Sequence, residues 1–217
     1  MSIPVTRLAS GEVVSVRHRP PTKATPVLLL LATMIGLGFV IGFAGRGSVK
    51  GLKDIHLRVV WVLFVALLVA LLPLFSDSIN AHRRPLQLVA FAGVLVFLVV
   101  NIVTNHGEIR AALLIVTLGW ALNFTVIAAN GGMPLSRWAY ATSGQAGTIT
   151  VGKGGFYRIV LGGPGTKLFR LGDVIPVKPY HVVVSIGDIL MVLGIALVIG
   201  AAMRTVRRTA TVQQPAQ

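Results

Sequence analysis

Cysteine is absent from the 217-residue sequence, and charged residues are scarce. Without cysteine the chain can form no disulfide, no thiolate metal site and no cysteine nucleophile. Asp, Glu, Lys and Arg together make up only 12% of the residues, whereas an ordinary soluble domain has roughly 25%. Hydrophobic residues make up 54%. This composition excludes both a soluble globular domain and an intrinsically disordered chain.

Acidic residues are the rarer of the two charges. Six Asp and Glu residues stand against 20 Lys and Arg, which gives a formal net charge of +14. A chain this apolar and this basic is typical of a protein in a membrane whose surface carries anionic lipid. We therefore expect a bilayer with anionic lipids as its main partner, and we expect no nucleic acid partner.

Five apolar stretches are long enough to cross a hydrocarbon core of about 30 Å, which needs roughly 17 to 25 residues of helix. They cover residues 26–43, 59–75, 86–103, 111–129 and 183–203. The first four contain no Asp, Glu, Lys, Arg or His, and in lipid a helix then satisfies every backbone polar group. The sequence predicts an all-α membrane protein that is a bundle of five transmembrane helices.

These spans divide the chain into three regions. A basic N-terminal segment covers residues 1–25, the membrane domain covers 26–203, and a basic, polar tail covers 204–217. The first apolar stretch is longer than the roughly 7 to 15 residues of a signal-peptide core, so we expect it to remain as a span. An odd number of spans places the termini on opposite sides. The arginines directly after residue 203 favour the N-terminus outside and the C-terminus inside.

The connector at residues 130–182 differs from the others, because it has 53 residues and holds 11 of the 24 glycines. Its many apolar residues predict a compact structure and not a free linker. Residues 147–151 and 156–161 carry β-branched and aromatic side chains between glycines, a pattern typical of a small β-hairpin. We expect this Gly-rich extramembrane loop to fold on one face of the bundle.

Asp188 is the one acidic residue inside a predicted span. Ser185 precedes it by three positions, which is the spacing of a capping box, where each side chain accepts a hydrogen bond from a free N–H of the first helical turn. A structural cap is therefore the favoured role. Two alternatives stay open, an ion pair or polar contact between helices and a proton or cation site.

Asp173 stands in a phrase similar to that of Asp188, LGDVI compared with IGDIL, and precedes it by fifteen residues. Two converging carboxylates would suit a proton or a hard cation. The simpler interpretation is an Asp in a turn before Pro176.

Asparagines are the other polar side chains near the bilayer. Asn101 and Asn123 lie in the third and fourth spans, and hydrogen bonds to neighbouring helices are a more common role for them than lining a solute path. Asn130, followed by two glycines, predicts the end of the fourth helix.

Glycines in the first and last spans form ridges of small residues. Gly38 and Gly42 have the GxxxG spacing that lets two helix backbones approach closely. Such ridges favour packing within a bundle, with self-association of the protein through Gly38 and Gly42 as the alternative.

No catalytic, metal or nucleotide motif is complete. Residues 147–154 match a phosphate-binding loop except at Gly154, where Ser or Thr would hold magnesium. The five histidines lie outside the spans without the HExxH spacing, and no GxSxG sequence occurs. We expect no enzyme activity, no catalytic residue, no metal, no cofactor and no nucleotide.

Several short motifs in the second half of the chain occur in a fixed order. They are Ala129–Pro134 (ANGGMP), Leu171–Pro176 (LGDVIP) and Ser185–Ile189 (SIGDI). With Arg46–Gly47 and Trp61, they make residues 27–200 resemble a bacterial membrane protein family, the domain of unknown function numbered 5317. The resemblance implies a multi-pass protein of the bacterial cell membrane and assigns no activity. This chain differs in its basic N-terminal segment and its polar tail.

The sequence therefore favours a non-catalytic accessory or scaffold component that binds partner proteins through the 130–182 loop or the glycine ridges. The alternative is a transporter of a small solute, a proton or another cation that uses Asp188, Asp173 and Asn123. Transporters commonly contain paired repeats or broken spans, and five unpaired spans fit that pattern poorly.

Overall fold

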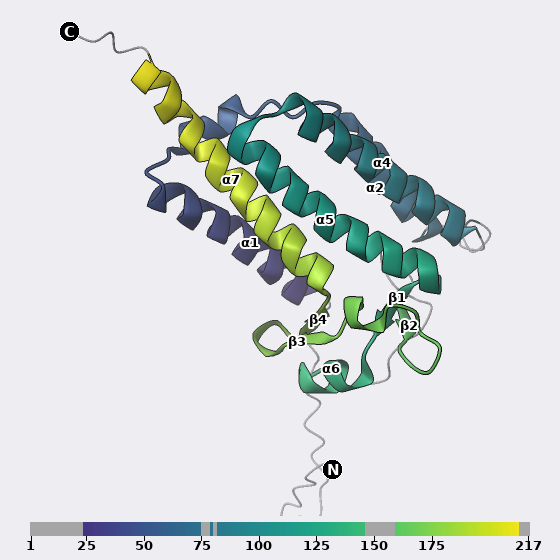
Figure 1. Cartoon of the computed structure of the whole chain (residues 1–217). Coiled ribbons are helices and arrows are strands. Elements are labelled where there is room, and N and C mark those ends of the chain that lie inside the picture. The colour runs from purple at the N-terminus through teal and green to yellow at the C-terminus, as the bar shows by residue number, and fades with distance from the viewer. Residues whose placement is uncertain (1–23, 75–78, 80–81, 146–158, 213–217) are drawn as a thin grey trace, which may run out of the picture.

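The computed structural model describes residues 24–74, 79, 82–145 and 159–212. Within these residues five long α-helices lie side by side and a small, mixed region covers one end of them (Figure 1). The helices are α1 (Ala24–Ala44), α2 (Val60–Leu71), α4 (Arg83–Thr104), α5 (Gly107–Asn130) and α7 (Ile186–Val212).

Helix α7 is the centre of one half of the bundle. It packs against α5 on one side and α1 on the other, while α4 packs against α5 and α2 packs against α4. Helix α1 runs parallel to α7 and α5 runs antiparallel to it, so that the start of α7 and the end of α5 lie at the same end of the bundle (Figure 1). The short connector η1 (Val49–Asp54) lies at the opposite end, beside the second half of α7.

Among the described residues, three helices are long and apolar enough to cross a membrane, at Arg84–Thr104, Gly107–Asn130 and Ile186–Arg204. Two shorter apolar helical stretches accompany them, Ala32–Ala44 within α1 and Val60–Leu71. The prediction of a mostly helical protein with apolar helices long enough to span a membrane is confirmed at this level.

The helix boundaries differ from several predicted span limits. The second predicted span, 59–75, is α-helical only to Leu71 and continues as a short 3-10 helix, η2 (Leu72–Leu74). Helix α5, which contains the fourth predicted span, begins four residues before it, at Gly107. The fifth begins at Ile186 instead of residue 183, because Val182–Val184 is a strand. Helix α7 also continues through Arg204 to Val212, so the predicted tail begins as helix.

The region between α5 and α7 is called the cap, and its described residues are 131–145 and 159–185. Its elements are β1 (Met133–Leu135), α6 (Arg137–Thr142), β2 (Ile159–Leu161), η3 (Phe169–Leu171), β3 (Ile175–Val177), η4 (Lys178–Tyr180) and β4 (Val182–Val184). Strands β1 and β2 pair in parallel, and β3 pairs antiparallel with β4. The predicted folded loop is therefore present.

The predicted hairpin falls largely outside the described residues. Residues 147–151 and the first half of 156–161 are not among them. The described part of the second predicted strand, Ile159–Leu161, pairs in parallel with Met133–Leu135. The antiparallel pair of the cap forms instead between β3 and β4, where η4 supplies the turn.

Two hydrophobic clusters hold α5 in place. Between α4 and α5, Phe91 lies 5.6 Å from Trp120 and 5.5 Å from Phe124, measured between ring centroids. At the end of α5, buried Val126 packs with buried Met133 of the cap. The first cluster joins two helices and the second fixes the cap to the end of the bundle.

The glycine ridge of α1 packs against another helix of the same chain. A Cβ atom on Gly38 would lie 2.8 Å from Cβ of Ile199, and one on Gly42 would overlap Met203. Both neighbours belong to α7. The ridge of α1 is therefore covered by α7 and is not an open surface for a second copy.

Candidate functional site

Helix α5 approaches α7 very closely where it crosses the start of α7. A Cβ atom on Gly119 would lie 2.5 Å from the carbonyl oxygen of Gly187, and one on Gly187 would lie 2.6 Å from the carbonyl oxygen of Gly119. Two glycines facing each other let the backbones come this close. One turn after Gly119, Asn123 is thereby brought against the first turn of α7.

Ser185 and Asp188 form the predicted capping box. The backbone N–H of Asp188 donates to Oγ of Ser185 at 3.0 Å, and the backbone N–H of Ser185 donates to Oδ2 of Asp188 at 2.9 Å. Both side chains thus satisfy free N–H groups of the first turn of α7. The pattern in the sequence predicted this local geometry correctly.

Asn123 joins the capping box from α5. Its Nδ2 donates to Oδ1 of Asp188 at 2.7 Å, and its Oδ1 accepts from the hydroxyl of Ser185 at 2.8 Å. Asn123 and Ser185 are buried, while Asp188 is half-buried. We call these three residues the Asn123–Ser185–Asp188 network. It is a polar contact between helices as well as a cap, so two of the interpretations left open for Asp188 hold together.

Asp173 lies in the cap close enough to Asp188 for the two charges to interact. Only 5% of Asp173 is exposed, and its Oδ1 has no hydrogen-bond partner in the described part of the chain. Burial, and after it the charge of Asp188, raises the pKa of Asp173 to about 8. The two carboxyl groups are therefore near enough for their charges to interact, which was the alternative to the favoured interpretation of Asp173 as an Asp in a turn.

Asn130 ends α5 as predicted and also ties the cap to it. Gly131 adopts the left-handed conformation, with φ of 68°, directly after the helix. The Asn130 side chain donates to the carbonyl of Lys167 at 2.8 Å and accepts from the N–H of Lys167 at 2.9 Å. The role of the Asn130 side chain is therefore structural, because these two hydrogen bonds fix the cap to the end of α5.

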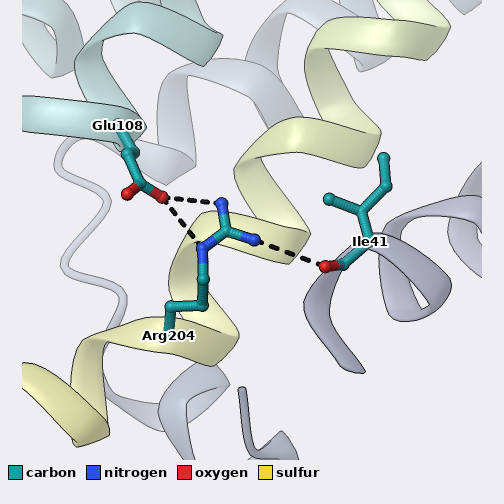
Figure 2. A network of polar contacts seen from close by, with 3 residues as sticks. All are labelled: Ile41, Glu108 and Arg204. Atoms are coloured by element: carbon teal, nitrogen blue, oxygen red, sulfur yellow. Dashed lines mark hydrogen bonds and ion pairs between the residues drawn. The ribbon is translucent and has the colours of Figure 1, made fainter. Parts of the chain in front are cut away.

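Sequence reasoning missed a polar contact at the opposite end of the bundle. Arg204 of α7 forms an ion pair with Glu108 of α5 at 2.6 Å and also donates to the carbonyl of Ile41 in α1 at 3.4 Å (Figure 2). The contact joins three helices. A signal was available in the sequence. Glu108 lies just before the fourth predicted span and Arg204 directly follows the fifth, and the predicted topology places both on the same face of the membrane.

Asn101 makes a second link between separate segments. It is fully buried, its Oδ1 accepts from the N–H of Arg58 at 2.8 Å, and its Nδ2 donates to the Arg58 carbonyl at 3.0 Å. This exchange fixes the residues that lead into α2 against the end of α4. The predicted packing role for asparagine in the third span describes this contact.

Among the described residues, His181 and Ser143 are a histidine and a serine that lie beside each other, but they do not form a catalytic pair. Nδ1 of His181 is 3.1 Å from the backbone oxygen of Ser143, and the Ser143 hydroxyl donates to the carbonyl of Tyr140. In the part of the chain that the structure describes, no three His, Asp or Glu side chains gather as metal ligands. Residues 147–154, the incomplete phosphate-binding pattern, lie outside the described residues.

Comparison with known proteins gives one match. Residues 54–200 match the model of a family described as "Family of unknown function (DUF5317)". Comparisons with curated proteins and with solved structures find no match. The matched residues include α2, α4, α5, the cap and most of α7.

Proposed function

Because the chain belongs to the family of unknown function DUF5317, we propose its role from its geometry: a bacterial cell-membrane protein with five membrane-spanning helices that acts as a non-catalytic accessory component. In this proposal the bundle is a rigid anchor, and the cap, on the outer face, binds a partner protein. The C-terminal end of α7 then lies inside, where its arginines follow the positive-inside rule.

Helix α2, one of the two shorter apolar helices, also has the exposed apolar surface expected of a membrane span. Trp61, Phe64 and Leu68 follow one another at helical spacing on α2, and each is 64 or 65% exposed. Large exposed side chains of this kind on one helical face suit lipid better than water. Helix α2, with 12 α-helical residues and three more in η2, spans about 22 Å at 1.5 Å per residue, which fits a tilted neighbour or a locally thinned bilayer.

One observation carries the accessory role. Two buried asparagines inside the bundle have closed hydrogen bonds, Asn123 to the capping box and Asn101 to Arg58, whereas Nε2 of buried Gln87 in α4 has no partner in the described residues. A transport path needs polar groups that are free to exchange partners with a solute. Closed hydrogen bonds instead support rigid packing of the helices.

The cap has the surface composition of a protein interface. Trp138 of α6 is 66% exposed, and the neighbouring Arg137 is exposed as well. Leu168 and Phe169 add exposed apolar area around η3. Aromatic residues and arginine are enriched where proteins bind each other, so these residues support the cap as the partner-binding part.

Site-specific photo-crosslinking in living cells tests the accessory role. A photoreactive amino acid at Trp138 is expected to give a discrete crosslinked band that mass spectrometry identifies as a second protein. The same amino acid at Val103, a 67% exposed residue on α4 that would face lipid, is the matched control and should give no such band. If residue 138 gives only uncrosslinked monomer, the cap is not a partner-binding surface.

A transporter of protons or cations is the second candidate. It is favoured by one specific observation, the unpartnered buried oxygen of Asp173 beside Asp188. Proton flux in proteoliposomes that depends on Asp173 would favour this candidate over the accessory role.

A further inference from the structure

Asp173 is held rigidly at the junction between the cap and the bundle. Its backbone N–H donates to the carbonyl of Pro134 at 2.8 Å, and its carbonyl accepts from the N–H of Ser136 at 2.9 Å. Residue Leu135, between these two, forms a parallel β-bridge with Asp173. These backbone bonds fix Asp173 against β1, and the side chain at this position is buried.

If the carboxyl group of Asp173 were ionised, one of its oxygens would lack a hydrogen-bond donor among the described residues. Its Oδ1 is buried and has no partner in the described residues. An ionised carboxylate only accepts hydrogen bonds, and a buried charge without donors is costly. The neutral acid removes that charge and turns one oxygen into a donor.

The charged groups of the neighbouring elements do not supply the missing positive charge. Strands β1 and β3 carry no titratable side chain. Arg170 of η3, Lys178 of η4 and Arg137 of α6 are exposed. Helix α7 contributes Asp188, a second carboxyl group whose two oxygens accept from Asn123 and from the N–H of Ser185.

From this arrangement we propose that Asp173 is a proton-binding site that links the attachment of the cap to pH. With the proton bound, the buried side chain of Asp173 carries no charge. Loss of the proton places a carboxylate without a donor for Oδ1 in a buried position, within reach of the charge of Asp188, and this weakens the junction. The inference concerns the cap and holds whether the protein is an accessory component or a transporter.

The direction of the pH effect follows from the pKa values. Asp173 has a pKa of about 8 in the folded chain and an ordinary value of 3.8. The folded chain keeps this proton over a pH range in which the unfolded chain has lost it. Stability is therefore highest at a pH below the ordinary pKa. It falls as the pH rises from about 4 to about 8. Above the folded pKa the dependence ends.

Thermal unfolding of the full-length chain in lipid nanodiscs, scanned from pH 5 to pH 9, tests the proposal. The parent Tm is expected to fall by several degrees up to about pH 8 and then to level off. Asp173→Asn, which cannot ionise, should flatten this slope and melt higher than the parent at pH 8. Glu108→Gln, which removes an acid at the far end of the bundle, is the matched control and should keep the parental slope.

Infrared spectroscopy of the parent chain supplies a readout that does not depend on any variant folding. A carbonyl stretch of a protonated carboxyl group is expected at pH 6 and should disappear by pH 9, and Asp173→Asn should lack it. The proposal is overturned if the parent has no such band at pH 6. It is equally overturned if Asp173→Asn keeps the parental pH slope, or if sodium or calcium at pH 6 replaces the proton and removes the band.

Discussion

Replacing Gly119 with valine is expected to lower the free energy of unfolding by about 3 kcal/mol or more, at the upper end of what extra side-chain carbon costs in a packed core. A Cβ atom there would lie 2.5 Å from the carbonyl oxygen of Gly187 and 2.9 Å from the backbone nitrogen of Met191. Both atoms belong to the backbone of α7, so no side chain can turn aside. The two helices would have to separate.

The matched control for Gly119→Val is Gly36→Val in α1, because no atom lies within 4 Å of a Cβ at Gly36. Glycine is itself a poor helix residue, so this change should be neutral or slightly stabilising. Denaturant titration in detergent, followed by circular dichroism, compares the two variants. Equal stability of the two variants would mean that α5 and α7 do not cross at this glycine pair.

Asn123→Asp is expected to cause the second large loss of stability, although the substitution only replaces an NH2 group with an oxygen. The substitution replaces the Nδ2 group, which donates to Oδ1 of Asp188 at 2.7 Å, with an oxygen that faces another acceptor. Two opposed carboxylates then occupy a buried site. Leaving a buried charged group without its partner costs about 3 kcal/mol or more.

Acid rescues this variant if the interpretation is correct. When the new carboxyl group is protonated it can donate to Asp188, so Asn123→Asp should approach parental stability near pH 4 and lose it towards pH 8. Asn123→Ala lacks a titratable group at this position and should be destabilised by about 1 to 3 kcal/mol without the rescue. A melting temperature of Asn123→Asp equal to the parent at pH 8 would show that Asn123 does not donate to Asp188.

Local sequence patterns predicted the parts of the site that depend on neighbouring residues. The capping box needs only Ser185 and a carboxyl group three residues later, and both are visible in the sequence. The partner on α5 was not predictable in this way, because Asn123 is 62 residues from Ser185. The structure adds that both oxygens of Asp188 accept hydrogen bonds, so an asparagine at this position would lose one acceptor.

The fold errors have a common physical cause. Apolar, β-branched residues fit a buried strand and a membrane helix equally well, so the predicted fifth span included Val183 and Val184, although both belong to β4. Pairing between distant segments is also hidden from periodicity. Strand β2 pairs in parallel with β1, 26 residues earlier at Met133↔Ile159, and no short-range signal distinguishes this from the predicted hairpin.

The most direct test of the proposed architecture is labelling of single cysteines with an impermeant maleimide, which the absence of native cysteine makes clean. Gly163→Cys lies exposed in the cap with open space around it, and Lys50→Cys lies exposed in η1 at the other end of α1 and α7. In right-side-out membrane vesicles the account predicts labelling of residue 163 and protection of residue 50 until the membrane is permeabilised. Labelling of residue 50 alone would reverse the orientation. Labelling of both before permeabilisation would contradict a bundle that crosses the membrane between its cap and η1.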